Sequence, residues 1–548
     1  MRRSFFAVSL FCALVLFFSC EDRQPRIQSI TPRIGIMGEI LTISGEHFGN
    51  TREESYVTIG GITPTTSSYV EWTDSRIQVR IPEFGDSGLV SVYRNNKKSN
   101  AALFSNRETM PETIQEDYTG IGPWIVSVEP ALGQIGSVVT IQGTGFGASR
   151  EGGGVFFAWD AESIPTPTGL NGPGSVEVSE TEFGYELWSE REIRVRVPDG
   201  AVGGNLTVRT HRGSSRPVFF DISGRPGTKT YKDKRSYAIS YSVDIRVQKA
   251  EGPNRLYLWL PRPVNATSQR NVQTLSRTAE PFIENYRGAT LFQMQNLQSG
   301  GGTGVTLSYL VEVYAVETDI NANSIGLQSG AARSRGSSSP IVTAYTAASA
   351  QIPSDDPRIK ERAAAVVGRE QNPYAKARRI YDYLLGEGGI QWEPLSGGPL
   401  EALEGKKADP YMAALLFCAM ARASGIPAIP VSGVLLDRNR IFSRHYWAEF
   451  WIEGFGWTPV DPALGAGAAP PSFTLRADRA NYYFGNLDNQ RISFSRGFTT
   501  LSQMDPRGRV TLRERNYALQ NLWEEAVGGL ESYSSLWSDV TLNGIYYQ

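Results

Sequence analysis

Apolar and polar residues alternate in short runs along residues 25–320, and glycine or proline closes most of these runs. The runs ILTI at 40–43, IQVRI at 77–81 and YAISYSVDIRV at 237–247 are examples. Such alternation places every second side chain on one face, as in a half-buried β-strand. Because 56 glycines and 31 prolines supply many turns, the pattern predicts β-sandwich modules rather than helical bundles.

Two segments of the first half repeat each other. PRIQSITPRIGIMGEILTISGEHFG begins at Pro25 and PWIVSVEPALGQIGSVVTIQGTGFG begins at Pro123, and their prolines, glycines and apolar residues coincide without gaps. The similarity resumes between WTDSRIQVRIP, from Trp72, and WSEREIRVRVP, from Trp188. We therefore expect one antiparallel sandwich at residues 25–106 and a second copy, with a longer internal loop, at residues 121–222.

The alternation continues to residue 320, which predicts a third sandwich over residues 228–320. A segment rich in glycine, serine and alanine follows and is typical of a linker. The apolar spacing then changes to that of helices. Asn372 is a favourable N-cap, Pro373 suits the first turn, and Gly386 ends the apolar face, so a helix is expected between them.

A second helix, from about Asp409 to Ser424, is apolar on nearly all sides, which predicts a central buried helix. The strand-like runs IPVSGVLL, HYWAEFWI and GWTPVDP follow it. The tail at residues 501–548 is predicted to form an amphipathic helix with an aromatic end.

Charge and length narrow the possible functions. The formal net charge is −2 and no run of lysine or arginine follows the first residues, so nucleic acid is not expected as a partner. The chain has 548 residues, which is enough for several domains.

The N-terminus predicts export. Arg2 and Arg3 precede an apolar run at 5–18, which is too short to span a membrane, so residues 1–19 are expected to be a signal peptide. The Ser-Cys end of this segment resembles the lipobox of bacterial lipoproteins, which implies that Cys20 is acylated. The alternative is a plain signal peptide followed by a chance cysteine.

The remaining cysteines and histidines argue against disulfides and metals. If Cys12 leaves with the signal peptide and Cys20 carries lipid, Cys418 is the only thiol left. The three histidines are scattered without partners at ligand spacing, so no metal or other cofactor is expected.

The first repeat resembles a known family. The proline-led strand, the G…G…I.G..FG pattern and the later I.V.(I/V)P resemble IPT/TIG domains in both copies. These are immunoglobulin-like folds of cell-surface and extracellular proteins, and the resemblance implies adhesion, ligand binding or simple spacing.

The second half resembles bacterial transglutaminase-like domains. The evidence is the order of a buried helix, RASGIPA, HYWAEFW and GFGWTPVDP. The resemblance implies an α+β papain-like fold, assigned here to residues 340–500, with a Cys-His-Asp triad. His445 and Asp461 fit the triad, but counting back from Gly425 places the expected cysteine at Pro410.

The chemistry of such a triad needs all three groups, because the thiolate attacks, the imidazole carries the proton and the carboxylate orients the ring. Cys418 lies roughly 12 Å further along the helix and about 80° around it. Asp409 is explained as the helix N-cap. Since losing a nucleophile costs on the order of 10⁶ in turnover in serine hydrolases, His445 and Asp461 are expected to be a vestigial pair.

The sequence therefore predicts a multidomain, exported, lipid-anchored protein of a bacterial envelope, with immunoglobulin-like sandwiches before a non-catalytic transglutaminase-like domain. The expected partner is a peptide, a glycan or an envelope protein. It is expected to bind in the former substrate groove, with Trp447, Glu449 and Trp457 as the lining residues. One alternative is an active acyl transferase or peptidase with an unrecognised nucleophile. Another is an adhesin that acts through the IPT/TIG-like pair.

Overall fold

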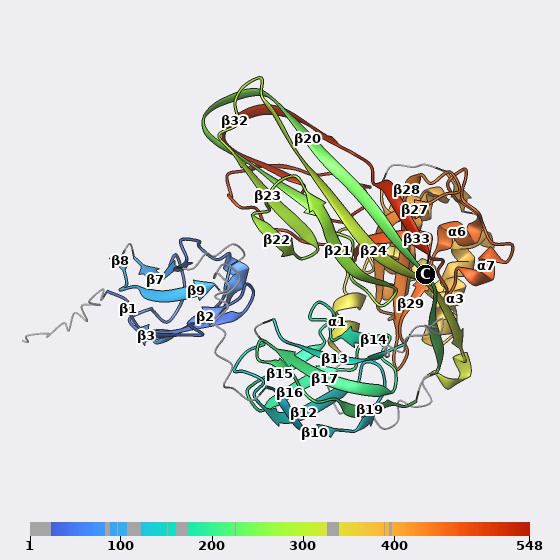
Figure 1. The fold of residues 1–548 in the computed structure, drawn as a ribbon, viewed down its shortest axis with the longest axis horizontal. Coiled ribbons are helices and arrows are strands. Elements are labelled where there is room, and N and C mark those ends of the chain that lie inside the picture. Colours follow the sequence, from blue (N-terminus) through green and yellow to red (C-terminus); the bar gives the residue numbers. More distant parts are fainter. Residues whose placement is uncertain are drawn as a thin grey trace, which may run out of the picture. The chain divides into compact units, whose positions relative to one another are not determined.

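The computed structural model describes residues 24–82, 88–95, 97–106, 122–150, 152–160, 174–224, 226–325, 339–387, 390–393 and 397–547. The chain divides into two compact units, residues 1–117 and 118–548 (Figure 1). The expected signal peptide and Cys20 lie outside the described residues. Within the described part of the chain, no helix is both long and apolar enough to cross a membrane.

The first unit is a sandwich of two sheets. One sheet has the order β1 (Arg26–Thr31), β3 (Ile40–Glu46), β6 (Arg76–Arg80), β5 (Tyr69–Trp72). The other has the order β2 (Ile34–Gly35), β9 (Ala102–Asn106), β7 (Gly88–Arg94), β4 (Tyr56–Ile59), with β8 (Lys97–Lys98) beside β7. Alternate residues such as Leu41 and Ile43 are fully buried between the sheets, so the alternation seen in the sequence marks the core.

The second copy has the same arrangement. One of its sheets has the order β10 (Trp124–Glu129), β12 (Val138–Thr144), β16 (Glu192–Arg196), β15 (Tyr185–Trp188). The other has the order β11 (Leu132–Gly133), β19 (Val218–Ile222), β17 (Gly204–Thr210), β13 (Gly154–Trp159), β14 (Gly174–Glu177), with β18 (Gly213–Ser214) beside β17. The indole of Trp72 donates to the Phe48 carbonyl at 3.0 Å, and Trp188 donates to Phe146 at 3.1 Å. The repeat in sequence is thus a repeat in structure.

A third region is built on one very long strand. Seven strands join β20 (Gly227–Pro261) in one eight-stranded sheet: β21 (Gln269–Arg277), β22 (Ile283–Tyr286), β23 (Ala289–Gln295), β24 (Gly302–Ile320), β31 (Arg509–Thr511), β32 (Glu524–Trp537) and β33 (Thr541–Tyr547). The predicted sandwich over residues 228–320 is therefore wrong in its limits, because the last residues of the chain complete this sheet.

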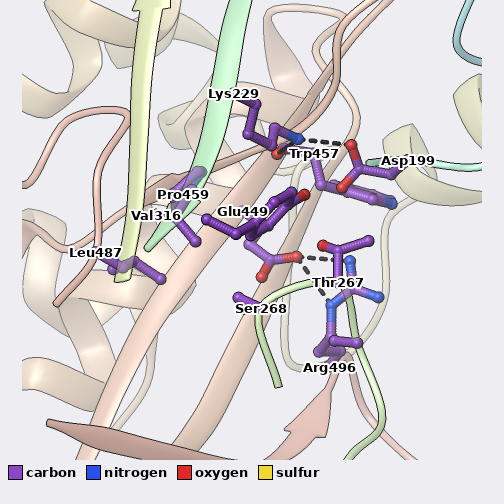
Figure 2. Close-up of a pocket in the computed structure, with 12 residues that line it drawn as sticks. Asp199, Lys229, Thr267, Ser268, Val316, Glu449, Trp457, Pro459, Leu487 and Arg496 are labelled. Carbon is purple, nitrogen blue, oxygen red and sulfur yellow. Dashed lines mark hydrogen bonds and ion pairs between the residues drawn. The ribbon is translucent and has the colours of Figure 1, made fainter. Parts of the chain in front are cut away.

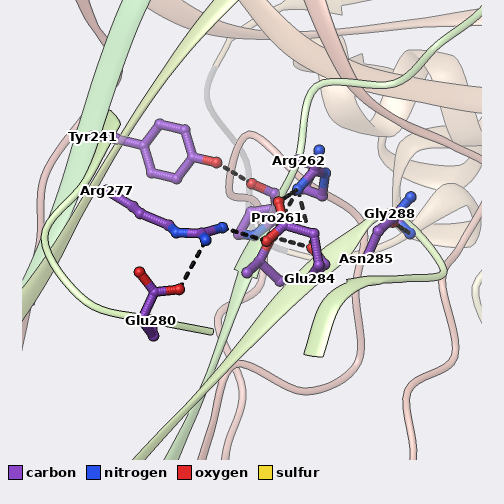
Figure 3. A network of polar contacts seen from close by, with 9 residues as sticks. Tyr241, Pro261, Arg262, Arg277, Glu280, Glu284, Asn285 and Gly288 are labelled. Carbon is purple, nitrogen blue, oxygen red and sulfur yellow. Dashed lines mark hydrogen bonds and ion pairs between the residues drawn. The ribbon is translucent and has the colours of Figure 1, made fainter. Parts of the chain in front are cut away.

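The sheet folds over on itself. The Tyr241 hydroxyl donates to the carbonyl of Pro261, twenty residues further along β20, whereas a straight strand would separate them by about 66 Å (Figure 3). Arg277 of β21 pairs with Glu284 of β22 at 2.6 Å, and Arg262 contacts the same carboxylate at 3.0 Å. β21 and β22 are opposite ends of the strand order β21-β24-β20-β23-β22, so these ion pairs link its two ends across the short connection between the two strands.

The predicted helical tail at residues 501–548 is wrong, because β31, β32 and β33 lie in this region. The strand β32 pairs with β20 from Val243 opposite Trp537 to Leu258 opposite Glu524. A Cβ atom on Gly529 would lie 1.5 Å from the Glu251 carbonyl oxygen, so this close approach of the two strands requires glycine. Pairing with a strand distant in sequence decides the structure of the tail, and a local helical pattern cannot reveal it.

The transglutaminase-like region combines short helices with a four-stranded sheet. The sheet has the order β29 (Gly456–Val460), β28 (Phe442–Ile452), β27 (Ala428–Leu436), β30 (Arg491–Arg496). The main helices are α1 (Pro340–Thr346), α2 (Pro357–Val367), α3 (Pro373–Asp382), α4 (Pro399–Gly405) and α5 (Pro410–Ala423), followed by α6 (Pro462–Ala466) and α7 (Arg479–Tyr482). The predicted fold class, sandwiches followed by an α+β domain, is confirmed.

Both helices predicted in this region are present. The Asn372 side chain accepts from the amides of Tyr374 and Ala375, at 2.9 and 3.2 Å, and so caps α3. Residues 412–421 of α5 are all buried, which makes this helix the centre of the domain.

The second immunoglobulin-like copy shares a core with the four-stranded sheet. Ile135 forms a β-bridge with Gly454, and a Cβ atom on Gly136 would lie 3.0 Å from the Trp451 ring. Lys229 pairs with the buried Asp199 at 2.5 Å and donates to a carbonyl of β29. The second copy, the folded-over sheet and the transglutaminase-like domain therefore form one body.

Two truncations test this division. A chain that ends at residue 500 loses β31, β32 and β33, so we expect it to be insoluble or to unfold without cooperativity, as followed by circular dichroism during heating. A chain that begins at residue 118 loses only the first unit, so its melting temperature should match that of the second unit in the full chain. A soluble, cooperatively folded chain ending at residue 500 would contradict the structure.

Candidate functional site

The N-terminus of α5 is built for stability. The Asp409 side chain accepts from the amide of Met412 at 2.8 Å, and Pro410 occupies the first helical position, where no hydrogen bond is lost. Arg515 forms an ion pair with Asp409 and lies over the Tyr411 ring at 4.9 Å. At the position where the family resemblance implies a thiol, the chain has a capped helix end held by an arginine.

Cys418 lies in the middle of α5 and is completely buried. Burial raises the pKa of its thiol to about 12, well above the ordinary value, because the apolar surroundings disfavour the thiolate. The thiolate is the nucleophilic form, so Cys418 is poorly suited to attack a carbonyl at neutral pH.

His445 and Asp461 lie together in the structure. His445 is on β28, Asp461 follows β29, and the Nε2 atom of the histidine is 2.8 Å from the Oδ2 atom of the aspartate. The other carboxylate oxygen accepts from the amide of Leu464 at 3.0 Å, so Asp461 also caps α6. Both side chains are at most 1% exposed, which places the pair in the interior.

Two further charged residues extend this pair. Arg491 of β30 donates to Asp461 Oδ2 at 3.0 Å and to Asp488 Oδ2 at 2.7 Å. Burial alone would raise the pKa of both aspartates, but the net effect is a lowered pKa in each. His445 and Arg491 offset burial at Asp461, and Arg491 does so at Asp488. We call His445, Asp461, Arg491 and Asp488 the buried charge cluster.

The two faces of β28 have different neighbours. Tyr446 packs against Tyr411 of α5, with ring centres 5.0 Å apart, and Phe450 packs against Phe417 of the same helix. Side chains alternate along a strand, so His445 points to the opposite face, where its ring stacks on Trp447. The structure therefore brings His445 and Asp461 together on the face of the sheet away from α5.

The three residues expected to line a groove lie on that same face. Trp447 and Trp457 are 2% and 3% exposed and pack in the core shared with the second immunoglobulin-like copy. The Glu449 carboxylate accepts from Arg496 at 2.7 Å, and Arg496 also pairs with Glu182 of the second copy. These tryptophans are mainly core residues.

A small cavity lies where the modules meet (Figure 2). It is partly open to solvent, and its lining residues include Asp199, Lys229, Glu449, Trp457 and Arg496. A neighbouring cavity is lined by Trp447, Asp488 and Arg491. Both cavities are flanked by charged groups that already have partners.

Sequence reasoning missed Arg491, Asp488 and Arg496. A signal was present, because Asp488 and Arg491 are three residues apart and both arginines flank the strand-like run ISFS. Charges beside a buried strand are expected to be paired. Among the residues that the structure describes, no group of three or more histidine, cysteine, aspartate or glutamate side chains is arranged to hold a metal ion.

Comparisons with known proteins identify two domains. Residues 360–462 match the transglutaminase-like superfamily, and residues 25–108 match the IPT/TIG domain. An uncharacterized protein of Haemophilus influenzae is 24% identical over 306 residues, which cover 48% of this chain and 79% of the relative. A cyclomaltodextrin glucanotransferase of Paenibacillus macerans is 28% identical over 89 residues, 16% of this chain and 12% of that enzyme.

Solved structures give weaker similarities. A protein of Cytophaga hutchinsonii with a provisional assignment as a cysteine protease is 13% identical, with a TM-score of 0.37, covering 58% of this chain and 93% of that one. SGBP-B from a xyloglucan utilization locus of Bacteroides uniformis is 12% identical, with a TM-score of 0.15, covering 54% of this chain and all of that one. Both TM-scores lie below 0.5, so we base the function on the residues of this chain.

Removing Arg491 should destabilise the second unit. The substitution Arg491→Met leaves two buried carboxylates without their common cation, and such a change typically costs about 3–5 kcal/mol. Urea unfolding followed by tryptophan fluorescence measures the loss. Arg507→Ala is the matched control. Arg507 is 89% exposed, and among the ion pairs of the described residues it pairs only with Asp505. This variant should therefore leave the unfolding curve unchanged. Equal curves for the two variants would contradict a stabilising cluster.

The same cluster predicts a pH dependence of stability. The folded-state pKa of Asp461 is lowered below its value in the unfolded chain, about 3.9, so its ionised form stabilises the fold above that pH. This contribution is lost as the pH falls through the folded-state pKa. Asp461→Asn should therefore be less stable at pH 7 and should lose less stability than the wild type on acidification below about pH 4. Parallel acid profiles would exclude this role for Asp461.

Proposed function

Because the chain combines an IPT/TIG domain with a transglutaminase-like domain, we propose that it is an exported, lipid-anchored envelope protein whose transglutaminase-like domain binds a partner without catalysis. The partner class is a peptide, a glycan or an envelope protein. In this proposal Cys20 carries the lipid, and the immunoglobulin-like copies belong to the extracytoplasmic part.

One observation carries the proposal: the N-terminal position of α5 holds Pro410, capped by Asp409, and has no thiol. Acyl transfer by a Cys-His-Asp triad begins with attack by a thiolate at this position. The described part of the chain offers only Cys418 as a thiol, and burial raises its pKa to about 12. A nucleophile is therefore missing where the chemistry needs one.

The surroundings of the histidine support the same proposal. The Nε2 atom of His445 is held by Asp461, which is itself bound to Arg491, and all three side chains are at most 4% exposed. An imidazole that exchanges protons with a substrate must reach that substrate. Here its strand presents Tyr446, and not His445, to the N-terminal end of α5.

An acyl-transfer assay tests the proposal directly. The chain from residue 21 to residue 548 is incubated with glutamine-containing peptides and a labelled amine, and hydrolysis is followed in parallel. We expect the wild-type chain to show no more turnover than His445→Ala, because in this proposal the histidine takes no part in chemistry. Reaction of Cys418 with a thiol reagent should likewise be undetectable until the protein unfolds, because the side chain is fully buried.

Turnover that disappears in His445→Ala would refute the non-catalytic role and favour the alternative of an unrecognised nucleophile. In that case Asp409→Asn and Cys418→Ala would be the next variants. The adhesin alternative is tested by deleting residues 25–117 and measuring surface attachment. A deletion to residue 222, in contrast, would also remove the second copy, which packs on Trp451.

A further inference from the structure

Three apolar side chains lie together on the outer face of one sheet of the first unit. Leu89 of β7 is directly opposite Leu103 of β9, and Ile34 of β2 is paired with Ser105, two residues from Leu103 on the same face. Side chains alternate along a strand, so Phe104 points the other way and is fully buried in the core. Ile34, Leu89 and Leu103 are 43%, 55% and 66% exposed, and we call them the first patch.

The second immunoglobulin-like copy exposes apolar side chains at two of the same positions. Leu132 takes the place of Ile34, and Phe219 takes the place of Leu103. They are 53% and 66% exposed. Leu132 is paired with Asp221, which lies two residues from Phe219 on the same face. We call Leu132 and Phe219 the second patch.

The repetition of these patches is the reason to assign them a partner. Single apolar side chains on a protein surface are common, whereas grouped ones mark surfaces that bind another protein. Each patch lies on the outer face of a sheet, and two such faces can pack on each other as the two sheets of a sandwich do. Because each patch has only two or three apolar residues, the contact is expected to be weak, as in interfaces below about 1,200 Å².

Charged side chains make the two patches complementary to each other. Arg33 precedes the first patch, where the second copy has Ala131. Asp221 lies within the second patch, where the first unit has Ser105. Arg33 and Asp221 are exposed, and neither forms an ion pair with another described residue. Contact between two first patches would bring two arginines together, and contact between two second patches would bring two aspartates together. The favoured contact is therefore between a first and a second patch.

We infer that the first patch of one molecule binds the second patch of another copy of this chain. Each chain has one patch of each kind, so the contact is head-to-tail and can extend to further molecules or close into a ring. This inference does not rest on the proposed function, because the patches lie on the immunoglobulin-like copies and not on the transglutaminase-like domain.

Sedimentation equilibrium of residues 21–548 over a range of protein concentrations tests the contact. The average mass should rise above that of the monomer as the concentration increases. Leu103→Asp and Phe219→Asp each place a charge in one patch, so each should weaken association about tenfold or more. Both side chains are more than half exposed, so the melting temperatures should stay near that of the wild type. Leu275→Asp is the matched control, because Leu275 is 53% exposed on β21, outside both patches, and it should associate like the wild type.

A mixture of the two patch variants tests the head-to-tail arrangement. Leu103→Asp keeps the second patch and Phe219→Asp keeps the first, so an equimolar mixture should form dimers that neither variant forms alone. Arg33→Asp should weaken association, and adding Asp221→Arg in the same chain should restore it.

Two results would overturn the proposal. One is a monomer at every concentration. The other is association that survives in Phe219→Asp but not in Leu103→Asp, because two first patches would then be in contact. Neither result depends on the acyl-transfer assay, so this inference and the proposed function can fail separately.

Discussion

The alternation of side chains along β28 is the constraint on which the second unit depends. This strand has β27 and β29 as neighbours and is covered on both faces, so the residues in its second half have to fit either the core around α5 or the core shared with the second immunoglobulin-like copy. Tyr446 and Phe450 lie on the α5 face, whereas Trp447 and Trp451 lie on the opposite face, together with His445, which stacks on Trp447. A shift of one residue would exchange the two sets, so the register of this strand is strongly specified.

The constraint also explains why a charged cluster persists in the interior. Asp461 follows β29, and Arg491 opens β30, so both reach the histidine face of the sheet from opposite sides of β28 and β27. Ions in such a place are tolerated only when their hydrogen bonds are complete. Asp461 meets this condition with His445, Arg491 and the amide of Leu464. The contacts of Asp461 thus bind the pair into the fold.

Local signals in the sequence predicted much of this architecture. The caps at Asn372 and Asp409 and the aligned prolines and glycines of the two repeats each depend on neighbouring residues, and the structure contains the corresponding helices and sandwiches. The closeness of His445 and Asp461 was expected from the family resemblance, and no feature of the two residues alone would have suggested it.

The errors concern contacts between segments far apart in the chain. The tail was expected to be helical because its apolar spacing resembles a helix, whereas pairing with β20 makes it a strand. Trp447 and Trp457 were expected at a groove; they line two small cavities, and nothing in the sequence indicated that they would also pack in the core shared with the second immunoglobulin-like copy. A local sequence pattern does not predict which module will cover a given face of the four-stranded sheet, because that depends on the packing of the whole second unit.

The position of the closing strands has a consequence for the order of folding. Protein chains are synthesised from the N-terminus, and domains generally fold as units in that order. The first unit is complete once residue 106 is available, but β20 meets β32 and β33 only after the last residues have been made. Until then one edge of the longest strand is unpaired, and exposed edges promote aggregation. A chaperone that shields residues 235–258 during this interval would protect the nascent protein when it is most vulnerable.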